Sequence, residues 1–208
     1  MGPVTSGRAD ANRRRILDVA LTELLHDPDA SMDQIARAAG VVRRTVYGHF
    51  PSREALIAAL VDNATAAVVE AHTTGRAGIS DPAEALARAI LAVWEIADRY
   101  RLLVAMAQRS VTMAGITQRL TPVREDCAAL LQRGLDEGMF TSPLPAAALA
   151  YVHEQALFGL MEAVNDGALP AAGAGIAAAS TALLSAGFPA DRAAALLAAI
   201  TDTVGARG

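Results

Sequence analysis

The sequence predicts an all-α protein with a small N-terminal domain and a larger C-terminal one. Apolar residues recur at helical spacing through almost the whole chain of 208 residues. No segment shows the alternation of Val, Ile, Thr or Tyr with polar residues that is typical of a strand. Glycine and proline mark the ends of the helical segments, and TTGRAGIS separates the two domains. We therefore expect a flexible arm at 1–9, a first domain at 10–56 with a connecting helix at 52–72, and a second domain at 73–208.

The first two helices have recognisable start and stop signals. An apolar stripe predicts a helix over about 10–26, before the sequence DPDA ends it. The stripe consists of Ile16, Leu17, Ala20, Leu21, Leu24 and Leu25. Ser31, followed three residues later by Gln34, forms a capping-box pattern that begins a short second helix. Gly40 ends this helix because glycine adopts the left-handed conformation without strain.

The third and fourth helices follow directly. The third is expected over about 42–49, and the sequence FPSREAL interrupts it. Ser52 is the expected N-cap of the fourth helix, which continues towards His72. Its apolar positions are Leu56, Ile57, Leu60, Val61, Ala64 and Val68.

The C-terminal domain is also expected to be helical. Asp81 as an N-cap, Pro82 in the first turn and Glu84 as a capping residue predict a helix over 82–98. Leu86, Ile90, Val93 and Ala97 supply its packing stripe. Further helices are expected at about 100–110, 114–137, 143–166, 175–186 and 189–204.

Charge and cysteine content narrow the functional classes. The net charge is −4, but residues 1–56 contain eight arginines against seven acidic residues, so the basic charge is concentrated there. Charged residues interrupt the longest apolar runs before the roughly 18 residues that a membrane span requires, and no signal-peptide pattern is present. We therefore expect a cytoplasmic protein with no membrane partner. A single cysteine, Cys127, allows no internal disulfide and no cysteine-rich zinc site, and we expect no metal or cofactor.

The segment around the third helix brings together side chains suited to nucleic acid. On a helical projection Val42, Val46 and Phe50 share an inward face and are expected to pack on the second helix. The outward face and its flanks carry Arg43, Arg44, Thr45, Tyr47 and Gly48. Two short helices joined at a glycine, the second with exposed hydrogen-bonding groups, form a helix-turn-helix that can enter the major groove. The alternative is an Arg-Arg pair that only solvates an exposed face.

The same segment resembles a known family. IARAAGVVRRTVYGHFPSREAL is similar to the signature of the tetracycline-repressor (TetR) family, and the resemblance extends over about 12–60. It implies that Arg43, Arg44 and Thr45 reach base edges, and that phosphates are bound by Tyr47, His49 and Arg53. Two positions depart from the family pattern: Val42 stands where a serine N-cap is frequent, and Arg44 where a small residue is frequent.

The remaining helices are too extensive to serve a DNA-binding domain alone. The segment 143–166 is apolar on several sides, which predicts burial against more than one neighbour. The resemblance to the TetR family implies that such C-terminal helices form a homodimer interface. The alternative is packing within one chain. A mixture of bulky, thioether and amide side chains suits a pocket for a small, largely apolar effector. The candidate pocket residues are Trp94, Met106, Gln108, Met113, Gln155, Phe158 and Met161.

Two functional hypotheses follow. The first is a ligand-responsive transcriptional regulator, a repressor that binds a pseudo-palindromic DNA operator as a homodimer. The second is an all-helical binding or scaffold protein, or a helical enzyme, with an incidental basic N-terminus. No nucleophile–base pair or phosphate-binding loop in the sequence favours the enzyme.

Overall fold

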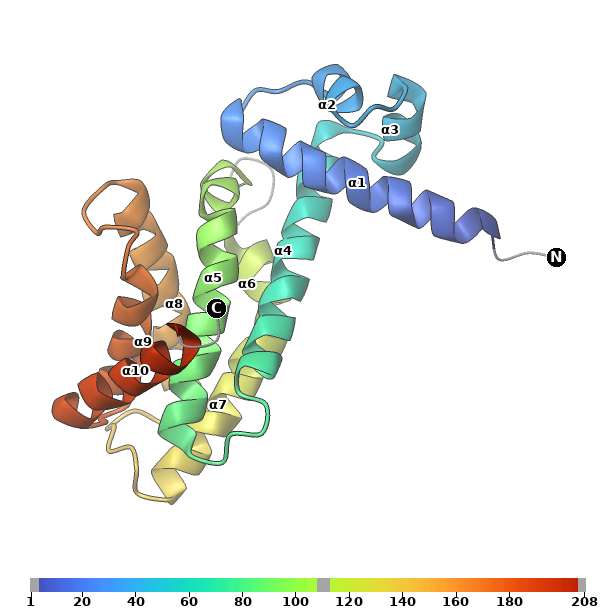
Figure 1. Cartoon of the computed structure of the whole chain (residues 1–208). Helices are drawn as coiled ribbons and strands as arrows, with labels where there is room; N and C mark the ends of the chain where they lie inside the picture. The colour runs from blue at the N-terminus through green and yellow to red at the C-terminus, as the bar shows by residue number, and fades with distance from the viewer. Residues whose placement is uncertain (1–3, 108–112, 206–208) are drawn as a thin grey trace. The chain divides into compact units, whose positions relative to one another are not determined.

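The computed structural model describes residues 4–107 and 113–205, and the regular elements in these residues are α-helices (Figure 1). This confirms the all-α prediction. The helices are α1 (Val4–His26), α2 (Met32–Ala38), α3 (Arg43–His49), α4 (Arg53–Gly75), α5 (Pro82–Ala107), α6 (Met113–Arg119), α7 (Thr121–Asp136), α8 (Ala146–Asn165), α9 (Ala174–Ser185) and α10 (Ala190–Gly205). They form two compact units, the first comprising 1–64 and 102–116, the second 65–101 and 117–208.

In the first unit, α2 contacts α1 and α3, and the three helices share an apolar core. The buried side chains include Ile16, Leu17, Leu24, Ile35, Val46, Phe50 and Leu56. The predicted capping box is present, because the Ser31 hydroxyl accepts from the Gln34 N–H and the Gln34 carboxamide accepts from the Ser31 N–H. Gly40 has φ 63°, which gives the turn between α2 and α3 its left-handed residue. The Ser52 hydroxyl accepts from the Ala55 N–H at the start of α4.

The prediction that Val42 points inward is wrong. Its side chain is 69% exposed, whereas Val46 and Phe50 on the same projected stripe are buried. Val42 is the N-cap of α3, with extended backbone angles of φ −74° and ψ 148°, so its Cβ does not follow the helical direction. Its valine side chain also leaves α3 without a side-chain cap, as the departure from the family pattern implies.

Three predicted helix boundaries also differ from the structure. Helix α1 begins at Val4 and not near residue 10, so residues 4–9 are part of the helix; residues 1–3 lie outside the described part. The predicted helices 82–98 and 100–110 are joined in α5, because the polar residues around 98–101 form an in-helix pair between Asp98 and Arg101 and contain no breaker. The predicted helix 114–137 is divided at Leu120 into α6 and α7. Pro122 in the first turn of α7 explains this division, since proline has no N–H to donate to the preceding turn.

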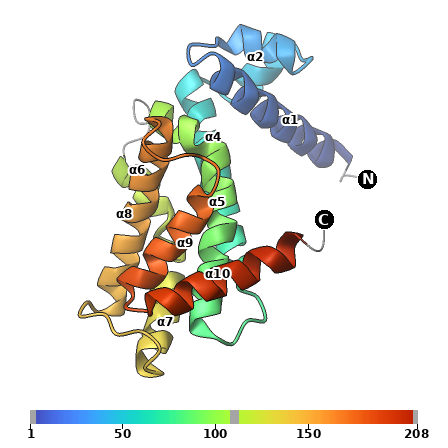
Figure 2. The same ribbon diagram turned by 60° about the vertical axis from the view of Figure 1, so that its left-hand side comes forward.

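The second unit is built around α7, α8 and α9. Helix α8 packs against α7 on one side and α9 on another, and α9 also contacts α10 (Figure 2). Leu149, Met161 and Val164 of α8 are buried, but Val152 is 41% exposed, so the apolar surface of α8 is only partly covered within one chain.

Helix α4 contains residues of both units. By length and composition alone it is apolar enough to cross a membrane. However, Leu56, Ile57 and Leu60 on one face of it are buried in the protein, which is the pattern of a core helix.

Candidate nucleic-acid interface

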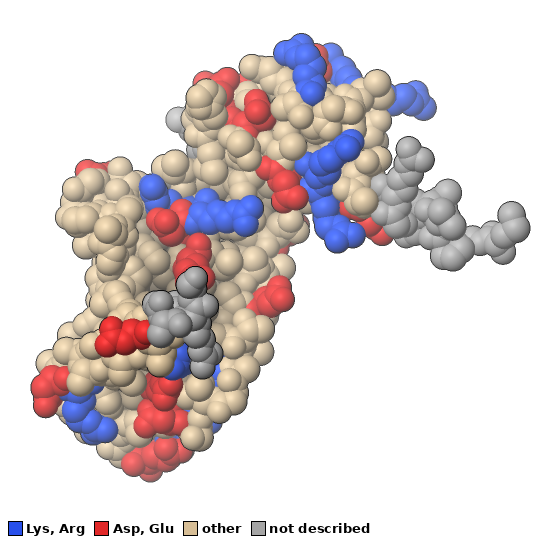
Figure 3. Space-filling view, in the orientation of Figure 1, with Lys and Arg blue, Asp and Glu red and all other residues tan. Residues whose placement is uncertain are grey.

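Helix α3 exposes a row of hydrogen-bonding side chains. Its one buried residue is Val46, and the outward positions Arg44, Tyr47 and Gly48 are all exposed, as predicted. A Cβ added to Gly48 would meet no atom within 4 Å, so this surface is open to another molecule. Figure 3 shows arginine side chains on the surface of the unit that contains α1 to α3. The arrangement fits the predicted outward face of a recognition helix.

Arg43, at the start of α3, is held by two neighbours. Its Nη1 donates to Oδ2 of Asp33 in α2 at 2.9 Å, and its guanidinium carbon lies 5.0 Å from the centre of the Tyr47 ring. Its Nη2 also donates to the Tyr47 hydroxyl at 3.4 Å. The Asp33–Arg43 contact was not predicted from the sequence, because it depends on how α2 and α3 cross. Arg44 has no such partner among the described residues and projects freely.

The other predicted phosphate-binding residues lie at the end of α3 and the start of α4. His49 is half-buried, with its ring 6.2 Å from that of Phe50. Arg53 is half-buried and its Nη2 donates to the carbonyl of Pro28, in the loop between α1 and α2. Arg53 therefore stabilises that loop in this structure, and a phosphate would have to share or replace this hydrogen bond. Thr45 is half-buried, beside the exposed Arg44.

Comparison with known proteins supports this interpretation of α2 and α3. Residues 16–60 match the family described as bacterial regulatory proteins, tetR family. The chain is 37% identical over 92 residues to the transcriptional repressor LfrR of Mycolicibacterium smegmatis, a match that covers 42% of the chain and 46% of LfrR. The segment that carries α2 and α3 is therefore similar to the DNA-binding segment of TetR-family regulators. The curated relatives are matched over about half of their length or less.

Solved structures show that the whole fold, and not only the N-terminal unit, is of the TetR type. The crystal structure of LfrR in complex with proflavine has a TM-score of 0.65 and 24% identity, over 85% of this chain and 96% of LfrR. FadR of Bacillus subtilis in complex with stearoyl-CoA has a TM-score of 0.70 and 16% identity, over 85% of this chain and 99% of FadR. The structure of RolR in complex with resorcinol has a TM-score of 0.57 and 20% identity, over 92% of this chain and 95% of RolR. The curated relatives that the chain matches over its N-terminal part are named as transcriptional regulators.

The predicted effector residues of this chain lie in different environments. Trp94 is buried, 6% exposed, and its ring lies against Gly175 of α9, where an added Cβ would come within 3.0 Å of Trp94 Cδ1. Met161 is buried, Phe158 half-buried and Gln155 exposed on α8. Met113 is half-buried in the other unit. Gln108 lies outside the described residues, and the side chain of Met106 is not described.

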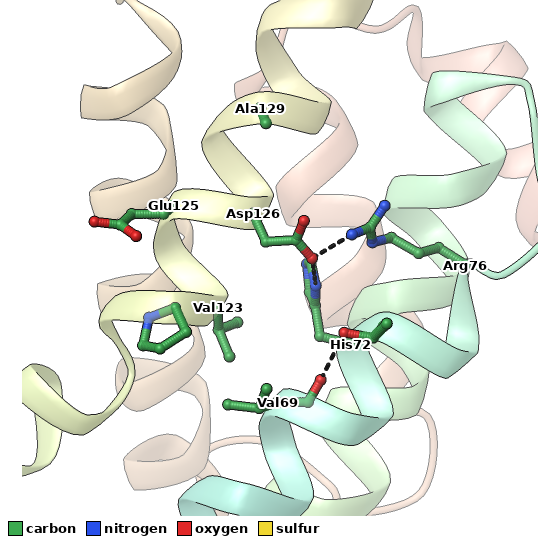
Figure 4. Close-up of a pocket in the computed structure, with 9 residues that line it drawn as sticks. Val69, His72, Arg76, Val123, Glu125, Asp126 and Ala129 are labelled. Atoms are coloured by element: carbon green, nitrogen blue, oxygen red, sulfur yellow. Dashed lines mark hydrogen bonds and ion pairs between the residues drawn. The ribbon is translucent and has the colours of Figure 1, made fainter.

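A pocket of about 520 Å³ lies between α4 and α7 in the second unit, and it contains none of the predicted effector residues (Figure 4). His72, Arg76 and Asp126 form its polar wall. Nδ1 of His72 is 3.1 Å from Oδ2 of Asp126, and Arg76 donates to the same oxygen. Burial lowers the pKa of His72, while Asp126 acts in the opposite direction. The cluster connects α4 to α7, and it was not predicted from the sequence because Asp126 lies 54 residues from His72 and 50 residues from Arg76.

A second buried polar cluster joins α7, α8 and α9. Nδ1 of His153 is 4.0 Å from the Cys127 sulfur, and Nε2 is 2.9 Å from the Ser185 hydroxyl. Burial lowers the pKa of His153 to about 4 and raises the pKa of Cys127 to about 12. The imidazole and the thiol are therefore both neutral at pH 7, and Cys127 is not a nucleophile there. Among residues 4–107 and 113–205, no group of three or more His, Cys, Asp or Glu side chains is placed to bind a metal ion.

Proposed function

We propose that this chain is a TetR-family repressor in the cytoplasm, which binds a pseudo-palindromic DNA operator as a homodimer and is released by a small effector. The exposed face of α3 is the observation that carries this proposal. This face exposes the side chains of Arg44 and Tyr47, and Gly48 leaves room for another molecule to approach the helix closely. Arginine donates two parallel hydrogen bonds to guanine O6 and N7, so Arg44 supplies base recognition. Tyr47, His49 and Arg53 supply phosphate contacts that position the helix.

The dimer is supported by apolar surface on two helices that contact each other. Val152 of α8 is 41% exposed and Leu184 of α9 is 46% exposed. They directly precede His153 and Ser185, which are hydrogen-bonded across the α8–α9 contact shown in Figure 2. We infer that a second copy of the chain covers this surface. The seven residues of α3 can contact only a few base pairs. In a homodimer, the two N-terminal DNA-binding domains, here called headpieces, are related by a two-fold axis and together recognise a longer site.

The effector is proposed from the related structures together with the predicted pocket residues. LfrR, FadR and RolR are described with proflavine, stearoyl-CoA and resorcinol, which are all organic molecules with aromatic or acyl parts. The residues that we predict for the effector site, among them Trp94, Phe158 and Met161, would supply aromatic and thioether contacts to a molecule of that kind. The effector changes DNA binding only if it binds one arrangement of the headpieces better than the other.

Gel-shift titration with DNA from upstream of the protein's own coding region tests the proposal. We expect a complex that forms at nanomolar to micromolar protein, survives a large excess of unrelated DNA, and weakens steeply with salt. Equal affinity for the upstream fragment and for a shuffled fragment of the same composition would contradict the proposal.

A further inference from the structure

The contact between Asp33 and Arg43 connects the two helices of the helix-turn-helix at the proposed DNA surface. Arg43 lies in the first turn of α3, and its partner Asp33 in the first turn of α2. The pair is 2.9 Å apart, and the Arg43 and Asp33 side chains remain 64% and 45% exposed. The guanidinium is thus oriented by Asp33 on one side and by the Tyr47 ring on another, but it is still accessible to a ligand.

The contact has opposite effects on specific and non-specific DNA binding. A carboxylate next to an arginine cancels much of the attraction that this arginine exerts on any phosphate, so it weakens binding to every sequence. The same carboxylate restricts the guanidinium to one orientation, which lowers the entropy lost when it forms two hydrogen bonds to a correctly placed base. Arg44, by contrast, has no acidic partner among the described residues and keeps its full charge.

We propose that Asp33 is a positioning residue that makes Arg43 selective for a base. It contributes specificity by holding the Arg43 guanidinium over Tyr47 and by reducing attraction to phosphates of any sequence. This inference rests on the proposed function, since it concerns the same DNA-binding surface. It assigns Arg43 and Arg44 different roles: Arg43 reads DNA in a fixed orientation, and Arg44 reads it as an unrestrained side chain.

The substitution Asp33→Asn tests the proposal, because asparagine keeps the shape of the side chain and removes its charge. The wild-type protein is first used to select a preferred duplex from randomised DNA. Affinity for this duplex and for a shuffled duplex is then measured over a range of salt concentrations. For Asp33→Asn we expect affinity for the shuffled duplex to rise about 3- to 10-fold at low salt, with a salt slope steeper by about one, because Arg43 becomes available to a phosphate. Affinity for the selected duplex changes less. The specificity ratio, which is the affinity for the selected duplex divided by that for the shuffled duplex, therefore falls.

Asp29→Asn is the matched control. Asp29 is an exposed acid in the loop before α2, and its backbone N–H donates to the Asp27 carboxylate. The substitution makes the same change in net charge without touching Arg43. It is expected to leave base preference and the specificity ratio unchanged.

A double substitution separates orientation from charge. Arg43→Ala alone is expected to relax preference at one base pair of each half-site. In the Arg43→Ala background, Asp33→Asn must then cause no further loss of base preference, because the side chain that it positions is absent. Circular dichroism and thermal unfolding confirm that each variant is folded, and Asp33→Ser provides a second replacement if the asparagine variant is not.

The outcomes distinguish this inference from the proposed function. A wild-type protein that selects no sequence from randomised DNA overturns the proposed function itself. A wild-type protein that does select a sequence, with Asp33→Asn and Asp29→Asn giving the same specificity ratio, overturns the role of Asp33 and leaves the proposed function intact. An effect of Asp33→Asn on base preference that persists without Arg43 also overturns it.

Discussion

Protonation of His153 is predicted to destabilise the protein in mild acid. The side chain is 3% exposed between α7, α8 and α9, and burial lowers its pKa from 6.5 to about 4. In the unfolded chain the pKa returns to its ordinary value, so the unfolded state binds more protons below about pH 6.5. The histidine therefore leaves the free energy of unfolding unchanged above pH 6.5, and lowers it as the pH falls towards 4.

The size of the effect follows from the shift. A difference of two to three pKa units, at about 1.4 kcal/mol for each unit, corresponds to a loss of about 3 kcal/mol between pH 6.5 and pH 4. This is a large part of the roughly 5–15 kcal/mol that stabilises a typical domain. The lowered pKa of the buried His72 acts in the same direction as the pH falls below about 6.5.

Urea unfolding at intervals from pH 7.5 to pH 4 measures the effect. His153→Gln, which keeps a polar side chain near Ser185, is expected to give a shallower fall in the free energy of unfolding below pH 6.5 than the wild type. His26→Gln is the matched control, because His26 is an exposed histidine at the end of α1. Equal slopes for the wild type and His153→Gln would refute the reasoning, as would an equal change caused by His26→Gln.

Three further predictions follow from the proposed function. Arg44→Ala should weaken binding to the selected operator by about 1–3 kcal/mol and relax one base preference, whereas Tyr47→Phe should weaken binding to all sequences alike. Competition gel shifts would show an unchanged preference if Arg44 does not reach a base. Val152→Asp should convert the proposed homodimer to a monomer at micromolar concentration in light scattering, and a wild type that is already monomeric contradicts the proposed interface. An inducing compound should change the fluorescence of Trp94, the only tryptophan, and Trp94→Phe should alter induction but not operator binding. Unchanged emission together with normal induction in Trp94→Phe would return Trp94 to a packing role.

Local signals predicted the N-terminal unit well. Ser31, Gln34 and Ser52 act within one turn of their own positions, and each caps the expected helix. The left-handed conformation of Gly40 is also a local requirement. These features depend on neighbouring residues only, which is why the sequence alone was sufficient to predict them.

The features that were missed depend on how separate helices pack. Asp33 meets Arg43 only because α2 and α3 cross at a particular angle, and no spacing rule gives that angle. His72, Arg76 and Asp126 are brought together by the packing of α4 against α7, which hydrophobic periodicity does not specify. The position of Val42 was misjudged for a different reason, since the helical projection was applied to a residue that is not yet helical. The roles assigned to the DNA-binding and effector residues remain predictions.

The Trp94 ring lies so close to Gly175 that it restricts which residue can occupy position 175. In the alanine-rich helix α9, replacing glycine with alanine would ordinarily favour the helix by up to about 1 kcal/mol, but here the new methyl group would press on the indole ring. Because position 175 has no side chain, the indole bears on the backbone of α9 with nothing between them that can change rotamer. A movement of the indole towards α9 would therefore meet the helix backbone itself.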